Sequence, residues 1–234
     1  RDQPRSRGLG DVYKRQMFRF FQVNRDIFLR TLCLVAVTLF FTSAGASQGE
    51  IILAVNTLLM QLFTLFSYVM DGFAYAGEAL SGRYIGARNR EAFTDTVRHL
   101  FGWGAVIAVL FTLVYALGGN AFLGLLTDDK EVIAVADTYF YWALAVPAVG
   151  IAAFIWDGIF IGATATRGML LSMAAAAVSF FILYYGLHPV LANHALWLAF
   201  LTYLLMRGVV QTGLSREVIR RAFPSKKEPA WREG

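Results

Sequence analysis

The sequence predicts an all-α polytopic membrane protein with six transmembrane helices. Of its 234 residues, 57% are hydrophobic and 16% are charged, whereas a typical soluble domain has about 25% charged residues. The mean hydropathy is high, at +0.54, and the apolar residues are gathered in long runs. A soluble globule of this size cannot bury so much apolar surface in one core, and a disordered chain would be polar and highly charged. Both of these classes are therefore excluded.

Six stretches are long enough to cross a bilayer, which takes roughly 20 predominantly apolar residues. They are 27–46, 51–76, 98–118, 132–158, 168–187 and 190–212. The second and fourth should continue as helix past their most apolar parts, through Gly77 and Gly158. In the fourth, Pro147 removes a helical hydrogen bond and should bend the helix. The sixth is the least uniform, because Asn193 and His194 stand near its start.

The segments outside the spans divide the chain into three parts. Residues 1–16 are polar and show no period, and the composition changes abruptly at Met17. They are too polar for a signal peptide, so we interpret them as a non-native or disordered leader, either a cloning remnant or a flexible cytoplasmic segment. Residues 17–223 form the six-span membrane unit, and residues 224–234 form a cytoplasmic tail.

The distribution of Lys and Arg predicts the orientation of the spans, because cytoplasmic loops carry an excess of both residues. If the first span begins inside, the outer segments contain only Lys130, within an acidic loop. The inner segments contain Arg19, Arg25, Arg30, Arg83, Arg88, Arg90, Arg98, Arg167, Arg207, Arg216, Arg220, Arg221, Lys226, Lys227 and Arg232. We therefore expect a multi-pass protein of the cell (inner) membrane with both termini cytoplasmic. Because basic residues alternate with apolar runs, the net charge of +5 does not indicate a nucleic-acid partner.

Two similar segments place acids and glycines at the inner end of a span. The first is DGFAYAGEALSGRYIGAR at 71–88, and the second is WDGIFIGATATR at 156–167. In the first, Asp71 and Glu78 are seven residues apart and share a helix face. Glycines at 72, 77, 82 and 86 would let neighbouring backbones approach closely, as small residues do between membrane helices.

The candidate substrate or coupling-ion residues are Asp71, Glu78, Asp137 and Asp157. Ionisable residues inside a membrane are functional candidates by default. Asp71 and Asp157 lie near the predicted inner interface, however, so each also fits a structural role, either bonding the end of a helix or pairing with Arg83 or Arg167. Glu78 fits a partner of Arg83, and Asp137 fits either a cavity wall or a solvated helix end.

Little else in the sequence indicates chemistry. A single cysteine, Cys33, excludes an internal disulfide. His188 and His194 flank Pro189 at a spacing that fits no helical metal pair, so a water-exposed turn is expected there. No nucleophile-elbow, HExxH, GxGxxG or P-loop string occurs. We therefore expect no metal, no cofactor and no enzymatic activity.

The first segment resembles the eighth span of multidrug and toxic compound extrusion (MATE) transporters, above all their DinF-type subgroup. The string DGFAYAGEA at 71–79, followed by Gly82 and IGAR at 85–88, carries this resemblance. The string DGIFIGAT at 157–164 resembles the end of the tenth span. The likeness extends from about Met17 to Phe223 and includes the six-span layout.

This resemblance implies that the chain is the C-terminal six-helix lobe of a two-lobe transporter. The implied activity is proton- or sodium-coupled export of small organic cations or other xenobiotics, with the N-terminal lobe supplied by the same polypeptide. The subgroup's coupling aspartate belongs to the N-terminal lobe and corresponds to no residue here. In another subgroup acids of the seventh and tenth spans bind the cation, but 27–46 contains no carboxylate and Asp137 is only a loose counterpart.

Three alternatives remain open. A lipid or polysaccharide flippase of the same superfamily would share the fold but favour a more cationic cavity. A structural or channel-forming membrane bundle would belong to a different class of protein. A channel would need a polar stripe lining its pore, which no span clearly shows. A membrane enzyme is disfavoured because no catalytic pairing is evident.

Overall fold

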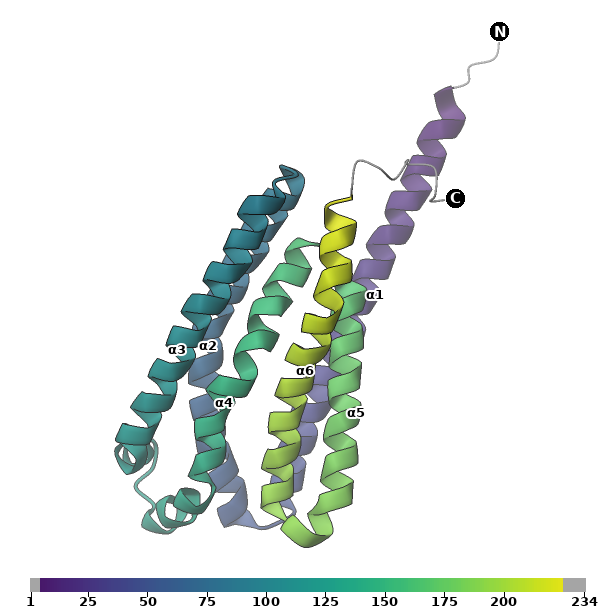
Figure 1. Ribbon diagram of the computed structural model, residues 1–234. Coiled ribbons are helices and arrows are strands. Elements are labelled where there is room, and N and C mark those ends of the chain that lie inside the picture. Colours follow the sequence, from purple (N-terminus) through teal and green to yellow (C-terminus); the bar gives the residue numbers. More distant parts are fainter. Residues whose placement is uncertain (1–4, 225–234) are drawn as a thin grey trace.

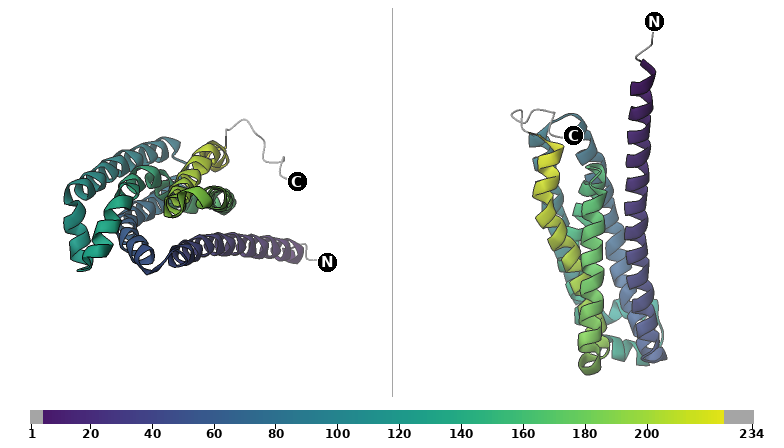
Figure 2. Two further views of the ribbon diagram at one scale, coloured as in Figure 1. Left: turned by 90° about the horizontal axis from the view of Figure 1, so that it is seen from below. Right: turned by 90° about the vertical axis from the view of Figure 1, so that its right-hand side faces the viewer.

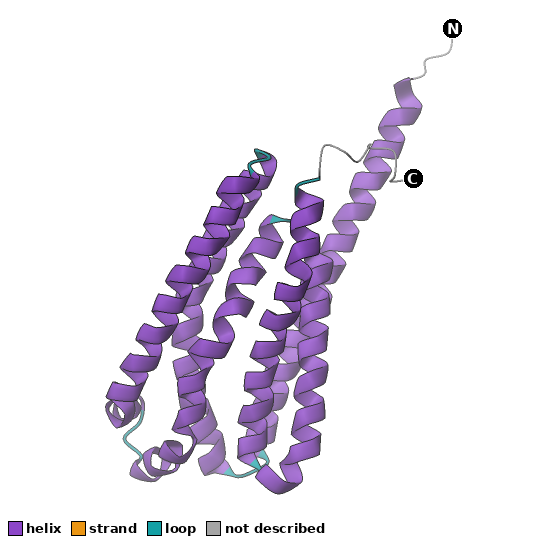
Figure 3. Ribbon diagram, in the orientation of Figure 1, coloured by secondary structure: helices purple, strands orange, loops and turns teal. Residues whose placement is uncertain are grey.

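The computed structural model describes residues 5–224, and this part of the chain is a bundle of six long helices without a strand (Figures 1 and 3). The helices are α1 (Arg5–Ala46), α2 (Glu50–Gly86), α3 (Arg90–Leu126), α4 (Lys130–Gly162), α5 (Thr166–Leu191) and α6 (Asn193–Ala222). All six are long and apolar enough to cross a membrane. The predicted fold class is therefore confirmed.

The helices pass alternately up and down the bundle and are joined by short turns. As Figure 1 shows, α1 begins and α6 ends at the same end of the bundle. We call this the inner end, following the predicted orientation, and the opposite end the outer end. Helix α4 is central and packs against α2, α3 and α6, while α5 packs mainly against α6. Helix α1 lies along one edge and contacts chiefly α5, with its N-terminal part extending past the other helices (Figure 2).

The helix bounds differ from the predicted spans in three places. Helix α1 already begins at Arg5, so the backbone does not change where the composition changes, although the apolar part of the helix begins at Gln16. The assignment of 1–16 as a leader stays a prediction, and most of the tail lies outside the described residues. Helix α3 is broken at Gly119, whose backbone is not helical, directly after the predicted end of that span. Helices α2 and α4 continue to Gly86 and Gly162, beyond their apolar parts.

The predicted outer turn between the fifth and sixth spans is nearly absent. His188 and Pro189 lie within α5, and His194 is the second residue of α6. Only Ala192 joins the two helices, with a φ of 47°. The expectation of two exposed histidines in a loop is therefore wrong, because α5 continues through Pro189 to Leu191 and both histidines are half-buried within helices.

The two similar sequence segments pack directly against each other. A methyl group at Gly158 would collide with the backbone of Ala74, and one at Gly162 would collide with the Ser81 side chain and the Glu78 carbonyl. The Ser81 hydroxyl also donates a hydrogen bond of 3.4 Å to the backbone oxygen of residue 159. These contacts confirm that glycines bring α2 and α4 together.

Only some of the predicted glycines take part in this contact. Around Gly77 and Gly82, atoms of α4 lie 3.6 Å from where a Cβ would be. A Cβ at Gly72 or Gly86 would meet nothing within 4 Å. For these two, the prediction of close backbone approach is wrong, because both face away from α4.

The bundle interior is apolar and rich in aromatic side chains. Trp197, Phe66, Phe180 and Tyr203 are almost completely buried. Large apolar side chains cover the outside, as at Leu117, which is 88% exposed. An apolar exterior around a packed interior is the surface that a bilayer requires.

Candidate functional site: a buried charge cluster that joins three helices

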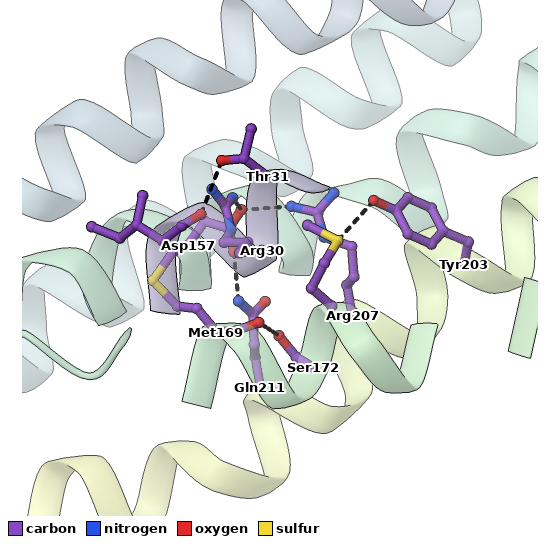
Figure 4. A network of polar contacts seen from close by, with 10 residues as sticks. Arg30, Thr31, Asp157, Met169, Ser172, Tyr203, Arg207 and Gln211 are labelled. Atoms are coloured by element: carbon purple, nitrogen blue, oxygen red, sulfur yellow. Dashed lines mark hydrogen bonds and ion pairs between the residues drawn. The ribbon is translucent and has the colours of Figure 1, made fainter. Parts of the chain in front are cut away.

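Asp157 is the centre of a polar network inside the bundle. It lies near the end of α4 and is buried. Its Oδ2 accepts hydrogen bonds of 2.5 Å from both Arg30 of α1 and Arg207 of α6, and its Oδ1 accepts one of 2.5 Å from the Gln211 amide (Figure 4). We call Arg30, Asp157, Arg207 and Gln211 the Asp157 cluster. It joins three helices through one carboxylate.

The residues of α6 reach Asp157 because they share one helix face. Tyr203, Arg207 and Gln211 are spaced four residues apart, so they form a stripe along the helix. The Arg207 guanidinium lies 5.6 Å from the centre of the Tyr203 ring, close enough for a cation–π contact. The Tyr203 hydroxyl in turn donates to the sulfur of Met173 on α5 at 2.9 Å. Arg207 is thereby held in position from two sides.

Helix α1 carries a similar stripe, formed by Gln22, Asp26 and Arg30. Asp26 is 1% exposed and accepts a hydrogen bond of 3.3 Å from Thr166 at the start of α5. With its amide oriented to suit its neighbour, Gln22 accepts hydrogen bonds from Arg167. The stripe therefore attaches the inner half of α1 through polar contacts at every helical turn.

The outer half of α1 is attached differently. Val37, Phe41 and Ala44 are buried there, and the Phe41 ring packs edge-on against Trp197 at 5.2 Å. One helix is thus held by apolar packing at one end and by a polar stripe at the other.

The Asp157 cluster contains two guanidinium groups and one carboxylate. Within the described residues, the Nε atoms of Arg30 and Arg207 and the Oε1 atom of Gln211 are buried without a hydrogen-bond partner. Asp71 of α2 is half-buried and lies close enough for the charges of Asp157 and Arg207 to act on its carboxyl group. No hydrogen bond or ion pair of the Asp71 side chain is found in the described part of the chain. Asp71 is therefore a second, free carboxyl group beside the cluster.

The arginine partners considered for the acids, Arg83 and Arg167, are not the ones that the structure shows. Asp157 binds Arg30 and Arg207 instead of Arg167, because it faces the bundle interior whereas Arg167 is exposed at the start of α5. Arg83 is exposed as well.

Of the remaining candidates, Asp71 and Glu78 lack, in the described part of the chain, the arginine partner considered for them, and Asp137 lies at a distance from the cluster. In residues 5–224, neither Asp71 nor Glu78 forms an ion pair with Arg83. Asp137 is exposed on α4, far along the helix from Asp157.

Sequence reasoning missed Arg30, Arg207, Gln211 and Asp26. The two arginines were counted among the basic residues of the inner flanks, although they stand inside apolar runs. The four-residue spacing of 22, 26 and 30, and of 203, 207 and 211, was the signal that could have identified both stripes.

Two cavities open near the inner end of the bundle. One, of about 560 Å³, lies between α1, α5 and α6 and includes Asp26, Arg167, Glu217 and Arg221 in its wall. The other, of about 360 Å³, lies between α2 and α3. No group of three or more His, Cys, Asp or Glu side chains suited to a metal ion occurs among the described residues.

The fold and the cluster together define a polytopic membrane bundle with ionised groups in its interior, an arrangement typical of secondary transporters. A family model described as MatE matches residues 27–190. The chain belongs to this family, the MATE transporters, and the predicted family and subgroup are confirmed. Because the family consists of transporters, the prediction that the chain is not an enzyme is also confirmed.

Two curated relatives show the extent of the similarity. The chain is 42% identical over 191 residues to DNA damage-inducible protein F of Escherichia coli (strain K12), which covers 82% of this chain and 41% of that protein. It is 26% identical over 133 residues to Protein DETOXIFICATION 45, chloroplastic, of Arabidopsis thaliana, covering 57% of this chain and 24% of that protein. The chain thus spans less than half the length of these relatives.

Solved structures share the fold. A MATE protein in the bent conformation matches with a TM-score of 0.70 and 17% identity, over 90% of this chain and 46% of that one. The Vibrio cholerae MATE transporter VcmN in the bent form matches with a TM-score of 0.68 and 21% identity, over 89% of this chain and 48% of that one. The six helices correspond to about half of each chain.

Proposed function

We propose that this chain is the C-terminal lobe of a cation-coupled multidrug or xenobiotic efflux antiporter. The observation that carries the proposal is the 42% identity to the Escherichia coli protein over 82% of this chain and only 41% of that protein. One six-helix bundle corresponds to half of a two-lobe transporter. The partner of this lobe is then the N-terminal lobe of the same polypeptide.

The proposed location is the inner membrane, with both ends of the lobe in the cytoplasm. The asymmetric distribution of Lys and Arg supports this orientation. The position of the start of α1 and the end of α6 at one end of the bundle is consistent with it (Figure 1).

The proposed substrates are small organic cations or other xenobiotics, and the proposed coupling ion is a proton or sodium, without a cofactor. The relatives' names, which include DETOXIFICATION and MATE transporter, support export of toxic compounds. In transporters of this kind, substrate sites lie between repeats that rock against each other. Substrate would then bind between this lobe and the N-terminal one.

Within this lobe we assign different roles to the two aspartates near the cluster. Asp157 is fixed by two arginines and an amide, which supports a structural role. Asp71 is half-buried and lacks such partners, which supports a role in coupling-ion or substrate binding. Glu78 and Asp137 are weaker candidates, because neither has a contact with the Asp157 cluster among the described residues and Asp137 is exposed.

One observation favours the flippase alternative. The guanidinium groups of the half-buried Arg30 and the buried Arg207 share the Asp157 carboxylate, and their Nε atoms have no partner among the described residues. Such an excess of positive charge suits an anionic lipid headgroup better than an organic cation.

Transport assays separate the two functions. A two-lobe transporter containing this chain is reconstituted into proteoliposomes, and export of ethidium is followed under an imposed proton or sodium gradient. Ethidium export that stops when the gradient is dissipated supports the antiporter. Translocation of a fluorescent anionic lipid without ethidium export would contradict the antiporter function and support the flippase function.

A further inference from the structure

At the outer end of the bundle, His194 of α6 is inserted among three aromatic residues of α4. Its Nδ1 lies 2.9 Å from the Tyr141 hydroxyl and 3.1 Å from the Trp142 Nε1. Its ring also packs against Tyr139, with 4.6 Å between ring centres. The side chain of His194 is half-buried at this contact.

The chemistry of tryptophan determines which nitrogen of His194 carries a proton. An indole N–H can only donate a hydrogen bond, so the Nδ1 atom that faces Trp142 must accept one. A histidine that accepts at Nδ1 is neutral and carries its proton on Nε2. The contact between α4 and α6 therefore requires the neutral ring.

A second proton on the ring would change this contact. It would bind to Nδ1, where it could donate to the Tyr141 oxygen but would point at the N–H of Trp142. Two donors that face each other cannot form a hydrogen bond, so the Trp142 indole would lose its partner. The stack on Tyr139 tolerates either state, because the face of an aromatic ring attracts a cation.

We propose that His194 is a proton-operated contact between α4 and α6 at the outer end of the lobe. At neutral and higher pH, the neutral ring binds Trp142 and holds the two helices together. At acidic pH, the protonated ring releases Trp142. Histidine suits this role because it is the side chain that ordinarily changes charge between about pH 5 and pH 8. The inference goes beyond the proposed function and holds whichever ion drives transport.

In the surroundings of His194, no other described group that changes charge in this pH range contacts the Trp142 hydrogen bond. The titratable groups that face it are the phenols of Tyr139 and Tyr141, both on α4. Within the described residues no ion pair reaches it, and the nearby acid Asp137 is exposed. Tyr141 is 50% exposed, so this contact lies at the surface of the lobe. Neutral hydrogen bonds from α2 and α6 join Asn56, Asn193 and Trp197 at the same end of the bundle, and they do not titrate in this range.

The chain offers a matched control in His188. This histidine lies at the same end of the bundle, on α5, and packs against Tyr184 with 4.8 Å between ring centres. It has no described hydrogen bond to a tryptophan. Replacing it removes a titrating group but leaves the contact between α4 and α6 intact.

The test uses a two-lobe transporter containing this chain, in phospholipid nanodiscs, labelled with 5-fluorotryptophan and studied by fluorine NMR from pH 5 to pH 8. The Trp142 resonance is assigned by its absence in Trp142→Phe. We expect this resonance to shift with pH as a single-proton titration, in wild type and in His188→Asn alike. His194→Asn should abolish the shift, because asparagine keeps a polar group near the position of Nδ1 but does not titrate.

Three results would overturn the proposal. One is a Trp142 resonance that does not move between pH 5 and pH 8 in the wild type, a measurement that needs no variant at His194. Another is a titration of Trp142 that persists unchanged in a folded His194→Asn. The third is loss of the Trp142 shift in His188→Asn, which would assign the titration to His188. If His194→Asn does not fold, the wild-type and His188→Asn titrations still decide the outcome.

Discussion

Arg30 and Asp157 are 127 residues apart in the sequence, and their side chains form an ion pair of 2.5 Å inside the bundle. This pair is the principal link between α1 and α4, because few residues of these two helices otherwise lie close together. The same Asp157 oxygen also binds Arg207 of α6. One carboxylate therefore determines how the edge helix is attached to the centre of the lobe.

The first prediction concerns Asp157→Asn in a two-lobe transporter. The substitution leaves two arginines without their counter-charge, and breaking a buried pair in this way costs roughly 3–5 kcal/mol. We expect the amount of folded protein and its melting temperature in detergent to fall more than transport per folded molecule. Size-exclusion chromatography after heating measures the first quantity, and dye export normalised to folded protein measures the second.

Asp137→Asn is the matched control, because Asp137 belongs to the same helix but is exposed. It should leave the melting temperature unchanged. If Asp157→Asn were as stable as wild type but had lost its dependence on the proton or sodium gradient, Asp157 would be a coupling residue and the structural assignment would be wrong.

The second prediction compares the two arginines. The Arg207 side chain is 7% exposed and that of Arg30 is 21% exposed. Arg207→Gln should therefore destabilise the lobe more than Arg30→Gln, since a more deeply buried pair loses more when one member is removed. Melting temperatures of both variants in the same detergent provide the comparison.

A double variant tests whether the residues act together. The effects of Asp157→Asn and Arg207→Gln should not add, because the second change removes a charge that the first has already left unpaired. We expect a coupling energy of about 0.5–3 kcal/mol, the usual range for residues in direct contact. Additive effects would show that Arg207 and Asp157 stabilise the lobe independently.

The sequence was sufficient to predict the six helices but insufficient to predict the cluster. A membrane-spanning helix can be recognised from one stretch of sequence, because about twenty consecutive apolar residues cross a bilayer as an α-helix. The partner of Asp157 is a property of the packing: the nearby Arg167 points away, and the distant Arg30 and Arg207 point inward. The four-residue spacing around Arg30 and Arg207 shows which residues share a helix face with them. Only the arrangement of α1, α4 and α6 in space shows that both arginines meet Asp157.

The third prediction concerns orientation. In a Cys33→Ser background, cysteines are placed at Glu91, in the first turn of α3, and at Asp128, between α3 and α4; both positions are exposed. The distribution of Lys and Arg predicts that residue 91 is cytoplasmic and residue 128 is outside. In intact cells, a membrane-impermeant thiol reagent should label Asp128→Cys and leave Glu91→Cys unlabelled until the cells are opened. Labelling in the reverse order would invert the lobe and contradict the proposed orientation.

The last prediction concerns the contact between α2 and α4 and uses Gly158→Ala. The added methyl group would collide with backbone atoms of Ala74, which cannot rotate away as a side chain could. Overpacking typically costs about 1–3 kcal/mol and occasionally more, so the melting temperature should fall and the neighbouring Asp157 cluster should be displaced. Gly72→Ala is the control, because a methyl group there meets nothing within 4 Å and alanine favours a helix by up to about 1 kcal/mol relative to glycine. It should be at least as stable as wild type. Equal stability of both variants would mean that α2 and α4 can separate without cost, and that close glycine packing does not hold Asp157 in place.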